Sequence, residues 1–212
     1  MKKQIQRVLI LTPFIFLMMA CSKDEEVKPL SDAVVIGSQT WTLTNLNVIK
    51  YSNGDDIPQV TDSASWANLT TGAWCYYKNN TDNGLVYGKL YNWYAVNDPR
   101  GLAPTGWHVA NEVEWTTLIT YLGEEVAGSK LKATTIWANN VATNSSGFTA
   151  LPGGARDEAG ESYWLDEMGT WWTSTQSSTT KAFDLTIYDN EPYTWDGDDN
   201  KGVGKAVRCV KD

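Results

Sequence analysis

The chain has 212 residues, with 17 Lys and Arg against 25 Asp and Glu, and its formal net charge of −8 argues against nucleic-acid binding, which needs a positive surface. The same charge argues against adsorption on an anionic bilayer. Aromatic residues make up 12% of the sequence, and eleven residues are Trp, which is far too aromatic for a disordered chain.

Residues 1–21 have the pattern of an export signal. Basic residues open the segment, and the apolar stretch over residues 8–20 is too short to span a bilayer. The stretch ends in a small residue followed by Cys21 and resembles a bacterial lipoprotein signal, which implies a signal peptide over residues 1–20 and acylation of Cys21. The alternative is an ordinary secretory signal that leaves Cys21 as a free thiol.

Residues 21–33 are expected to be a flexible tether between the lipid and a domain over residues 34–212. The run of one Lys and several acidic residues directly after Cys21 resembles the short signal that sends lipoproteins of one bacterial phylum to the outer face of the outer membrane. We therefore expect a lipid-anchored outer-membrane protein exposed at the cell surface, with the lipid as its membrane contact. A plain solvated tether, with retention on the periplasmic side, is the alternative.

Within the domain, residues 34–43 predict a hairpin and residues 45–71 a long loop. The clearest helix follows Asn111, which can cap it, while Glu114 completes a capping box and Gly123 ends it. These elements predict one α+β domain, mostly antiparallel β with one or two helices and long loops. The other expected elements are a strand at 73–77, a turn at 79–84, a helix or a strand at 85–96, a short helix at 128–133, and strands at 171–174, 183–188 and 204–210.

Two cysteines remain once Cys21 is acylated, namely Cys75 and Cys209. An exported chain meets an oxidising compartment, so we expect these two to form a disulfide, worth about 4 kcal/mol in the chain-entropy model. Two buried thiols, or a reactive pair, are the alternatives.

Five ordered motifs resemble a known family. They lie at residues 87–96, 106–115, 146–154, 171–175 and 207–212, and include Gly106-Trp107-His108-Val109. On these motifs the chain is similar to the FISUMP family, the Fibrobacter succinogenes major paralogous domain, from about residue 34 onward. Ala110 and Ala155 depart from the usual pattern. The resemblance implies a C-type lectin-like fold in a cell-envelope lipoprotein, and it implies no settled activity.

The matching motifs carry residues that we expect to be structural. Large aromatic side chains bury much apolar area, and their polar atoms find partners at the edge of a core. His108 is the single His and lacks a second one for a metal site, so we expect a satisfied buried histidine. Arg156 is expected to form an ion pair or to bind the backbone. The Trp residues expected in the core are Trp93, Trp107, Trp115 and Trp172.

Residues 188–200 are the most suggestive segment for function, because they combine five carboxylates, two Asn and three aromatic side chains. Oxygen ligands suit Ca²⁺, which gives a candidate calcium site at Asp196, Asp198 and Asp199. Exposed Trp and Tyr can stack on sugar rings, so the segment also predicts a glycan site. A solvated acidic hairpin, with its turn at Asp196-Gly197, is the alternative. The candidate ligand-binding residues are Tyr188, Asp189, Glu191, Tyr193, Trp195, Asp196, Asp198 and Asp199.

A second acidic cluster, with Asp157, Glu158 and Glu161, could hold the carboxylate pair of a glycosidase, although loop acids explain it adequately. The chain has no P-loop and no recognisable nucleophile or metal-protease motif, so we expect no enzymatic activity. The leading hypothesis is a surface lipoprotein whose domain binds an extracellular glycan, or an envelope or host protein. The alternatives are a structural or adhesin component of the cell envelope without a small ligand and, third, a glycoside-active enzyme.

Overall fold

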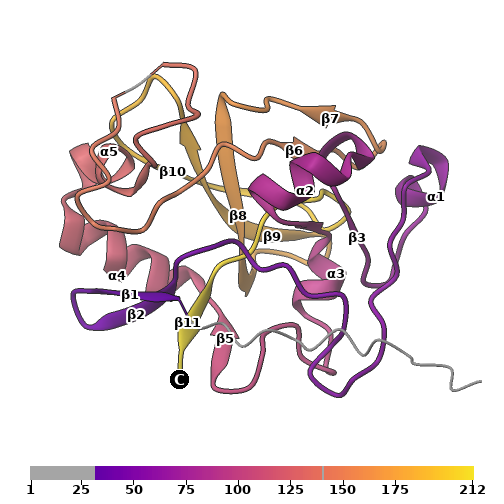
Figure 1. Ribbon diagram of the computed structural model, residues 1–212. Coiled ribbons are helices and arrows are strands. Elements are labelled where there is room, and N and C mark those ends of the chain that lie inside the picture. Colours follow the sequence, from indigo (N-terminus) through magenta and orange to yellow (C-terminus); the bar gives the residue numbers. More distant parts are fainter. Residues whose placement is uncertain (1–31, 140) are drawn as a thin grey trace, which may run out of the picture.

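The computed structural model describes residues 32–139 and 141–212 and has an α+β architecture of antiparallel sheets flanked by short helices (Figure 1). The fold class expected from the sequence is confirmed at this level. The predicted signal peptide, residues 1–20, and the acylation site Cys21 lie outside the described residues. In the described ranges, no helix combines the length and the apolar character that a membrane span requires.

A four-stranded sheet joins segments from both ends of the described chain. Its strands are, in order, β1 (Ala33–Ile36), β2 (Gln39–Thr42), β11 (Cys209–Lys211) and β5 (Trp107–Val109). The predicted opening hairpin is confirmed as β1 and β2. The closing strand is shorter than the predicted 204–210, because residues 204–206 make single bridges to three other segments instead.

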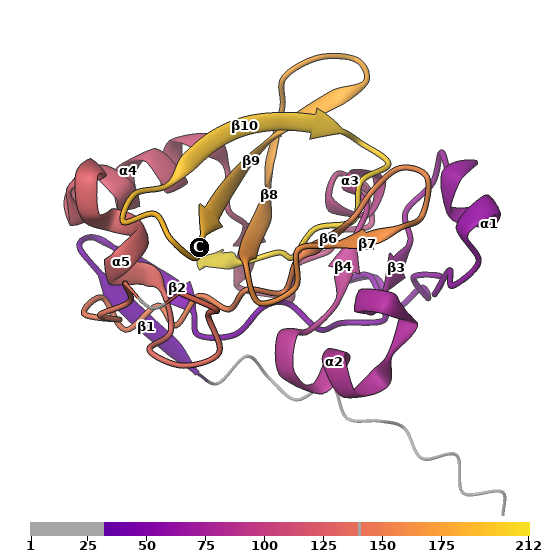
Figure 2. The same cartoon turned by 90° about the horizontal axis from the view of Figure 1, so that it is seen from above.

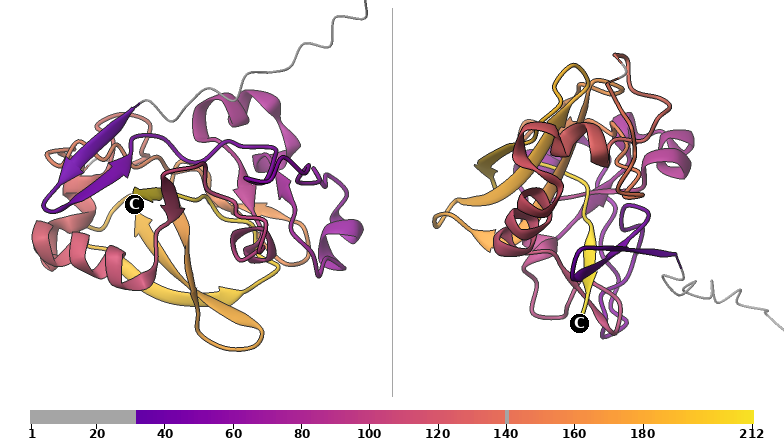
Figure 3. Two further views of the ribbon diagram at one scale, coloured as in Figure 1. Left: turned by 90° about the horizontal axis from the view of Figure 1, so that it is seen from below. Right: turned by 90° about the vertical axis from the view of Figure 1, so that its left-hand side faces the viewer.

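The longest strands form a three-stranded antiparallel sheet in the order β10-β9-β8 (Figure 2). They are β8 (Met168–Gln176), β9 (Lys181–Tyr188) and β10 (Trp195–Asn200). β10 lies on the opposite side of the molecule from β1 (Figure 3). The turn expected at Asp196-Gly197 is wrong, since both residues lie inside β10 and pair with β9. Six residues of cross-strand pairing outweigh the local turn preference of Asp-Gly.

Helix α4 (Glu112–Leu122) begins and ends as predicted. The Asn111 side chain accepts a hydrogen bond from the Glu114 backbone N–H, and the Glu114 carboxylate accepts one from the Asn111 N–H. Gly123, with φ +89°, follows the last turn, where a residue with a side chain would be strained. The complete capping box and the glycine stop fix both ends of this helix locally.

The other helices are short. The turn expected at 79–84 is wrong, because Asn80 caps helix α2 (Thr81–Tyr87) there. The short helix expected at 128–133 is found as α5 (Ala127–Leu131). Residues 85–96 hold the end of one helix, a strand and a second helix. The remaining elements are α1 (Ser63–Ala67), α3 (Trp93–Val96), the 3₁₀ helices η1 (Tyr77–Asn79) and η2 (Glu124–Val126), and the strands β3 (Trp74–Cys75), β4 (Leu90–Tyr91), β6 (Ala155–Arg156) and β7 (Ser162–Tyr163).

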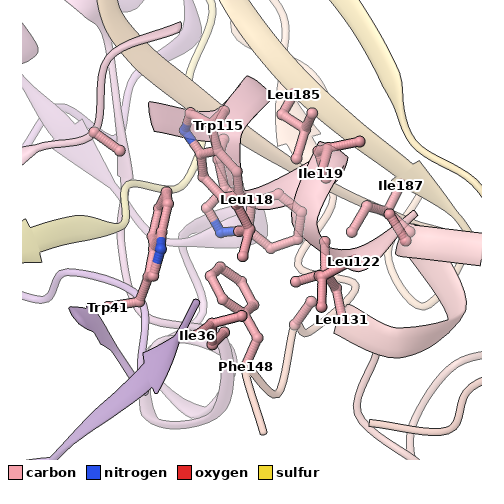
Figure 4. Close-up of a cluster of buried hydrophobic side chains, with 14 of the residues drawn as sticks. Ile36, Trp41, Trp115, Leu118, Ile119, Leu122, Leu131, Phe148, Leu185 and Ile187 are labelled. Carbon is pink, nitrogen blue, oxygen red and sulfur yellow. The ribbon is translucent and has the colours of Figure 1, made fainter. Parts of the chain in front are cut away.

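The largest apolar cluster lies between α4 and the three-stranded sheet. Figure 4 shows Trp115 of α4 among Trp41, Phe148 and Leu185, which come from three other parts of the chain. The ring centroids of Trp41 and Trp115 are 4.6 Å apart. Of the Trp residues predicted to be core, Trp93, Trp115 and Trp172 are buried, whereas Trp107 is only partly buried.

Arg156 is buried and binds the backbone, which is one of the two roles expected for it. Its guanidinium donates hydrogen bonds to the carbonyl oxygens of Val60, Thr61 and Gly160. It also stacks over the Trp66 ring at 4.6 Å from the centroid. The side chain therefore holds the long loop after β2 against β6.

His108 departs from the expectation of a buried residue. Its side chain is 40% exposed, because β5 is an edge strand. Its Nε2 lies 2.6 Å from Glu114 Oε1 and its Nδ1 lies 2.7 Å from Asp212 Oδ1. The ring is satisfied, as expected, but by two carboxylates at the surface.

The expected disulfide between Cys75 and Cys209 is not formed, and both residues are buried free thiols. Cys75 packs with Trp66 and Leu90, whereas Cys209 belongs to a different apolar cluster. Burial raises the pKa of Cys75 to about 11 and that of Cys209 to about 12. Of the two alternatives to a disulfide, the structure supports the buried thiols.

Candidate functional site

One face of the three-stranded sheet carries a pocket of about 460 Å³, here called the sheet-face pocket. Its floor is formed by β8 and β9, one side by β10, and the other by β7 and the residue that follows it. Alternate side chains of a strand point to the same face, so the strand register decides which ones meet there. The rows across β8, β9 and β10 are Thr170–Thr186–Trp195 and Trp172–Asp184–Gly197.

The floor of the sheet-face pocket is polar. Lys205 Nζ lies 2.9 Å from Asp184 Oδ2 and 2.7 Å from Asp199 Oδ2. The Lys205 and Asp184 side chains are 3% and 6% exposed, whereas that of Asp199 is 45% exposed. Thr186 Oγ1 donates to Asp184 Oδ1 and pairs with the Thr170 hydroxyl. The floor thus presents a hydrogen-bonded chain of hydroxyl, carboxylate and ammonium groups.

The sides of the sheet-face pocket are aromatic. Trp164 is 51% exposed and Trp195 is 49% exposed, although both are large apolar residues. Trp164 stands between Tyr163 and Tyr188, with ring centroids 5.6 Å and 5.7 Å away, in edge-to-face contacts. These contacts hold the indole ring in a defined orientation beside the polar floor.

The loop before β10 is anchored by a buried lysine. Lys132 Nζ donates to the carbonyl oxygens of Asp189 and Glu191, at 2.8 Å and 2.7 Å. Burial lowers the pKa of Lys132 to about 8. Below this loop, a Cβ at Gly128 would lie 2.3 Å from the Tyr193 carbonyl oxygen, so only glycine fits. The loop that delivers Trp195 to the pocket therefore rests directly on α5.

Some of the predicted ligand-binding residues face the sheet-face pocket, and others do not. Tyr188, Trp195 and Asp199 face the sheet-face pocket, as a binding role requires. Asp189 is buried, and its carboxylate accepts a hydrogen bond from Asn139 instead. Glu191 and Tyr193 belong to the anchored loop, where the Tyr193 ring packs against that of Trp195. Asp196 and Asp198 lie on β10 at the edge of the pocket.

The carboxylates of the predicted calcium site do not converge. Asp196 and Asp198 point by register to the face of β10 opposite to Asp199. They border a smaller hollow of about 140 Å³ beside α4 as well as the edge of the sheet-face pocket. Asp198 pairs with Lys181 and Asp199 pairs with Lys205, at 2.9 Å and 2.7 Å. Across residues 32–139 and 141–212, no three His, Cys, Asp or Glu side chains are placed to hold a metal ion. An extended strand separates neighbouring carboxylates, so the calcium interpretation does not fit.

The side chains of the second acidic cluster accept hydrogen bonds that stabilise the local backbone and a neighbouring strand. Asp157 Oδ1 accepts a hydrogen bond from the Glu161 backbone N–H, and Glu158 Oε1 accepts one from Asn200 Nδ2. Asp157, Glu158 and Glu161 do not line the sheet-face pocket. They therefore do not face the space that could hold a sugar, although the charges of Asp157 and Glu158 act on the pKa of the neighbouring Tyr163.

Sequence reasoning missed several residues of the sheet-face pocket. The alternation in β9 placed Asp184 and Thr186 on one face, but their neighbours across the sheet could not be read from it. Trp164 stands in the acidic cluster and Lys205 in an expected strand, and neither was assigned to a site. Only the bridging of residues 204–206 to three segments brings Lys205 to the pocket.

Comparison with known families gives one match. The family model of the Fibrobacter succinogenes major domain matches residues 34–211, which is most of the chain and all the elements from β2 to β11. No curated protein and no solved structure matches the chain. The resemblance stated from the sequence motifs is confirmed, and the chain belongs to the Fibrobacter succinogenes major domain family.

Proposed function

We propose that this chain is a lipid-anchored cell-surface protein whose domain binds a carbohydrate, without catalysis, in the sheet-face pocket. The observation that carries the proposal is the position of two half-exposed indole rings, Trp164 and Trp195, beside a floor of buried polar groups. Exposed apolar side chains gathered at one place mark interaction sites on soluble domains. Here they adjoin carboxylate and hydroxyl groups instead of a plain apolar surface.

The chemistry of a sugar matches both parts of the pocket. A pyranose has an apolar face of C–H groups, which packs against a flat indole ring, and a rim of hydroxyl groups. Hydroxyl groups donate to carboxylates such as Asp184 and both donate to and accept from hydroxyls such as Thr186. A volume of about 460 Å³ lies within the usual range for small-ligand sites and suits one or two sugar rings.

The location of the pocket suits a tethered receptor. β1 is the first strand after the tether, and it lies on the opposite side of the molecule from β10 (Figure 3). With Cys21 acylated in the outer membrane, the pocket would face away from the attachment point. The antiparallel sheets and long loops are compatible with a variant of the C-type lectin-like fold, which we include in the proposal. We expect no nucleic-acid partner, because the net charge is −8.

The direct test is a glycan array probed with the full chain in a detergent that contains no sugar headgroup, since a glycosidic detergent would compete. We expect binding that persists in a chelator, because the carboxylates near Trp195 do not form a metal site. Trp195→Ala and Trp164→Ala should each weaken binding about tenfold or more, as for aromatic side chains that a bound ligand covers. Tyr121→Ala is the matched control, because Tyr121 is an exposed aromatic residue on α4 that does not line the pocket.

The outcomes separate the hypotheses. Binding lost in both Trp variants, with unchanged melting temperatures and with the Tyr121 variant active, supports the proposal. Absence of binding to every glycan would favour an envelope or host protein as the ligand, or a structural role in the cell envelope. Turnover of an oligosaccharide would show an enzyme instead.

The proposed lipid anchor at Cys21 and the exposure at the cell surface are tested by separate experiments. Cys21→Ser should move the protein from the membrane fraction to the soluble fraction of the cells. Protease treatment of intact cells should digest the wild-type protein if it is surface-exposed, and protection of the protein would place it on the periplasmic side.

A further inference from the structure

The sheet-face pocket is lined by more acidic than basic side chains. Asp184 and Asp199 face it, Asp196 and Asp198 border it along β10, and Lys205 is the cation among its lining residues. Lys205 Nζ is shared between both carboxylates and stands 4.8 Å from the centre of the Trp172 ring. Lys205, Asp184 and Asp199 together carry a net charge of −1, and the Lys205 ammonium is already paired with both carboxylates.

The surroundings strengthen the negative field. Burial raises the pKa of the Tyr163 phenol, and the charges of Asp199, Asp157 and Asp184 raise it further. At Tyr188, which also contacts Trp164, burial and then the charges of Asp184 and Asp199 raise the pKa in the same way. The two phenols beside Trp164 therefore experience a field dominated by carboxylates.

Gly197 leaves a narrow access to the central carboxylate, whose side chain is 6% exposed. It stands directly opposite Asp184 in the register of β9 and β10, on the pocket face. A Cβ at Gly197 would lie 3.7 Å from the Asp184 carboxylate oxygens, an ordinary contact, so a longer side chain would cover the carboxylate without straining the strand. Each oxygen of Asp184 already accepts one hydrogen bond, from Lys205 or from Thr186, and a carboxylate oxygen can accept two.

We propose that the sheet-face pocket selects glycans without negative charge, with Asp184 accepting hydrogen bonds from sugar hydroxyls through the opening at Gly197, and that it rejects hexuronic acids. This inference rests on the proposed function. A sugar carboxylate in the pocket would meet Asp184 and Asp199 at short range, and it could reach Lys205 only by displacing one of them. In a partly buried site this repulsion is screened much less than in bulk water.

The test compares sugars that differ in one group. Immobilised glucose, galactose and mannose are matched with glucuronic, galacturonic and mannuronic acid, and full-length wild-type protein is applied to each pair. We expect binding to the acid of a recognised pair to be about tenfold weaker. Competition by the soluble methyl glycosides gives the same comparison without any variant.

Two variants test which residues cause the preference for neutral sugars. Asp199→Asn removes the more exposed carboxylate while Lys205 keeps its pair with Asp184, so the preference for the neutral sugar should shrink several-fold. Gly197→Leu should abolish binding of both sugars by covering Asp184. Gly202→Ala is the matched glycine control, since a Cβ there meets only Glu158 Cβ, at 3.7 Å, and the position lies outside the pocket.

Equal or stronger binding of hexuronides by the wild-type protein would overturn the charge selection while leaving carbohydrate binding intact. Binding that survives in a folded Gly197→Leu protein would overturn the role of Asp184. Loss of every glycan signal in the wild-type protein would overturn the proposed function together with this inference.

Discussion

Lys205 and Asp184 form an ion pair with an Nζ–Oδ2 distance of 2.9 Å, in which both side chains are almost fully excluded from solvent. Asp184 belongs to the central strand of its sheet, whereas Lys205 belongs to the segment that leads into β11. The Lys205 backbone also exchanges both of its hydrogen bonds with Tyr91. The pair therefore connects the pocket floor to the segment that links three separate parts of the fold.

Removing Lys205 should destabilise the protein strongly. In Lys205→Met the Asp184 carboxylate stays buried without its cation, which typically costs about 3 kcal/mol or more. The control is Lys181→Met, because Lys181 forms an exposed pair with Asp198 that is worth less than about 1 kcal/mol. Urea unfolding of both variants measures the difference, and equal midpoints would contradict a structural role for the buried pair.

Gly128 should support the loop that carries Trp195. A Cβ at this position would lie 2.3 Å from the Tyr193 carbonyl oxygen, so Gly128→Ala must push the loop away from α5. We expect a loss of about 1–3 kcal/mol in stability, together with weaker glycan binding. Thermal unfolding and binding assays, with Gly202→Ala in parallel, check this. A Gly128→Ala protein that behaves like the Gly202 variant would show that the loop adapts freely.

The His108 cluster should make stability depend on pH. Burial lowers the pKa of His108, but its hydrogen bonds to Asp212 and Glu114, with their charges, raise it above 6.5 overall. A folded-state pKa above the unfolded value means that the stabilisation is fully present below about pH 6.5 and is lost as the pH rises through the folded-state pKa. His108→Gln should therefore cost more at about pH 5.5 than at about pH 9, by less than about 1 kcal/mol because the ring is half exposed. Denaturant unfolding at both pH values measures this, and a cost independent of pH would refute it.

Cys75 and Cys209 should not react in the folded protein. Both thiols are buried, and burial raises their pKa to about 11 and about 12, so almost no thiolate is present at neutral pH. An alkylating reagent should label neither residue in the native state and both after denaturation without reductant. Peptide mapping by mass spectrometry distinguishes them from Cys21. A cross-linked peptide pair would instead show that the disulfide forms.

Local sequence signals were sufficient where neighbouring residues decide the structure. The capping box of Asn111 and Glu114 and the stop at Gly123 set the ends of α4, because their hydrogen bonds and backbone angles involve only adjacent turns. The two-residue turn of β1 and β2 is local in the same way. Local signals failed at Asp196-Gly197, where turn propensity competes with strand pairing to distant residues.

The candidate site could be predicted only in part, because it also depends on contacts between residues far apart in the chain. Residues 188–200 stood out by composition, and Tyr188, Trp195 and Asp199 do face the pocket. Asp189 stood out equally, yet it is buried against Asn139, a contact between residues far apart in the chain. Composition identifies groups that can bind, but it does not show which way an extended strand turns each of them.

The sequence by itself determined the family, the α+β class, the boundaries of α4 and the burial of Trp93, Trp115 and Trp172, because these depend on local hydrogen bonds, apolar content and ordered motifs. Only the tertiary structure decided that Lys205 joins Asp184, that Trp164 and Trp195 flank one pocket, and that Cys75 and Cys209 stay apart. These relationships come from strand register and from packing between distant segments, whose free energy exists only once the segments have met.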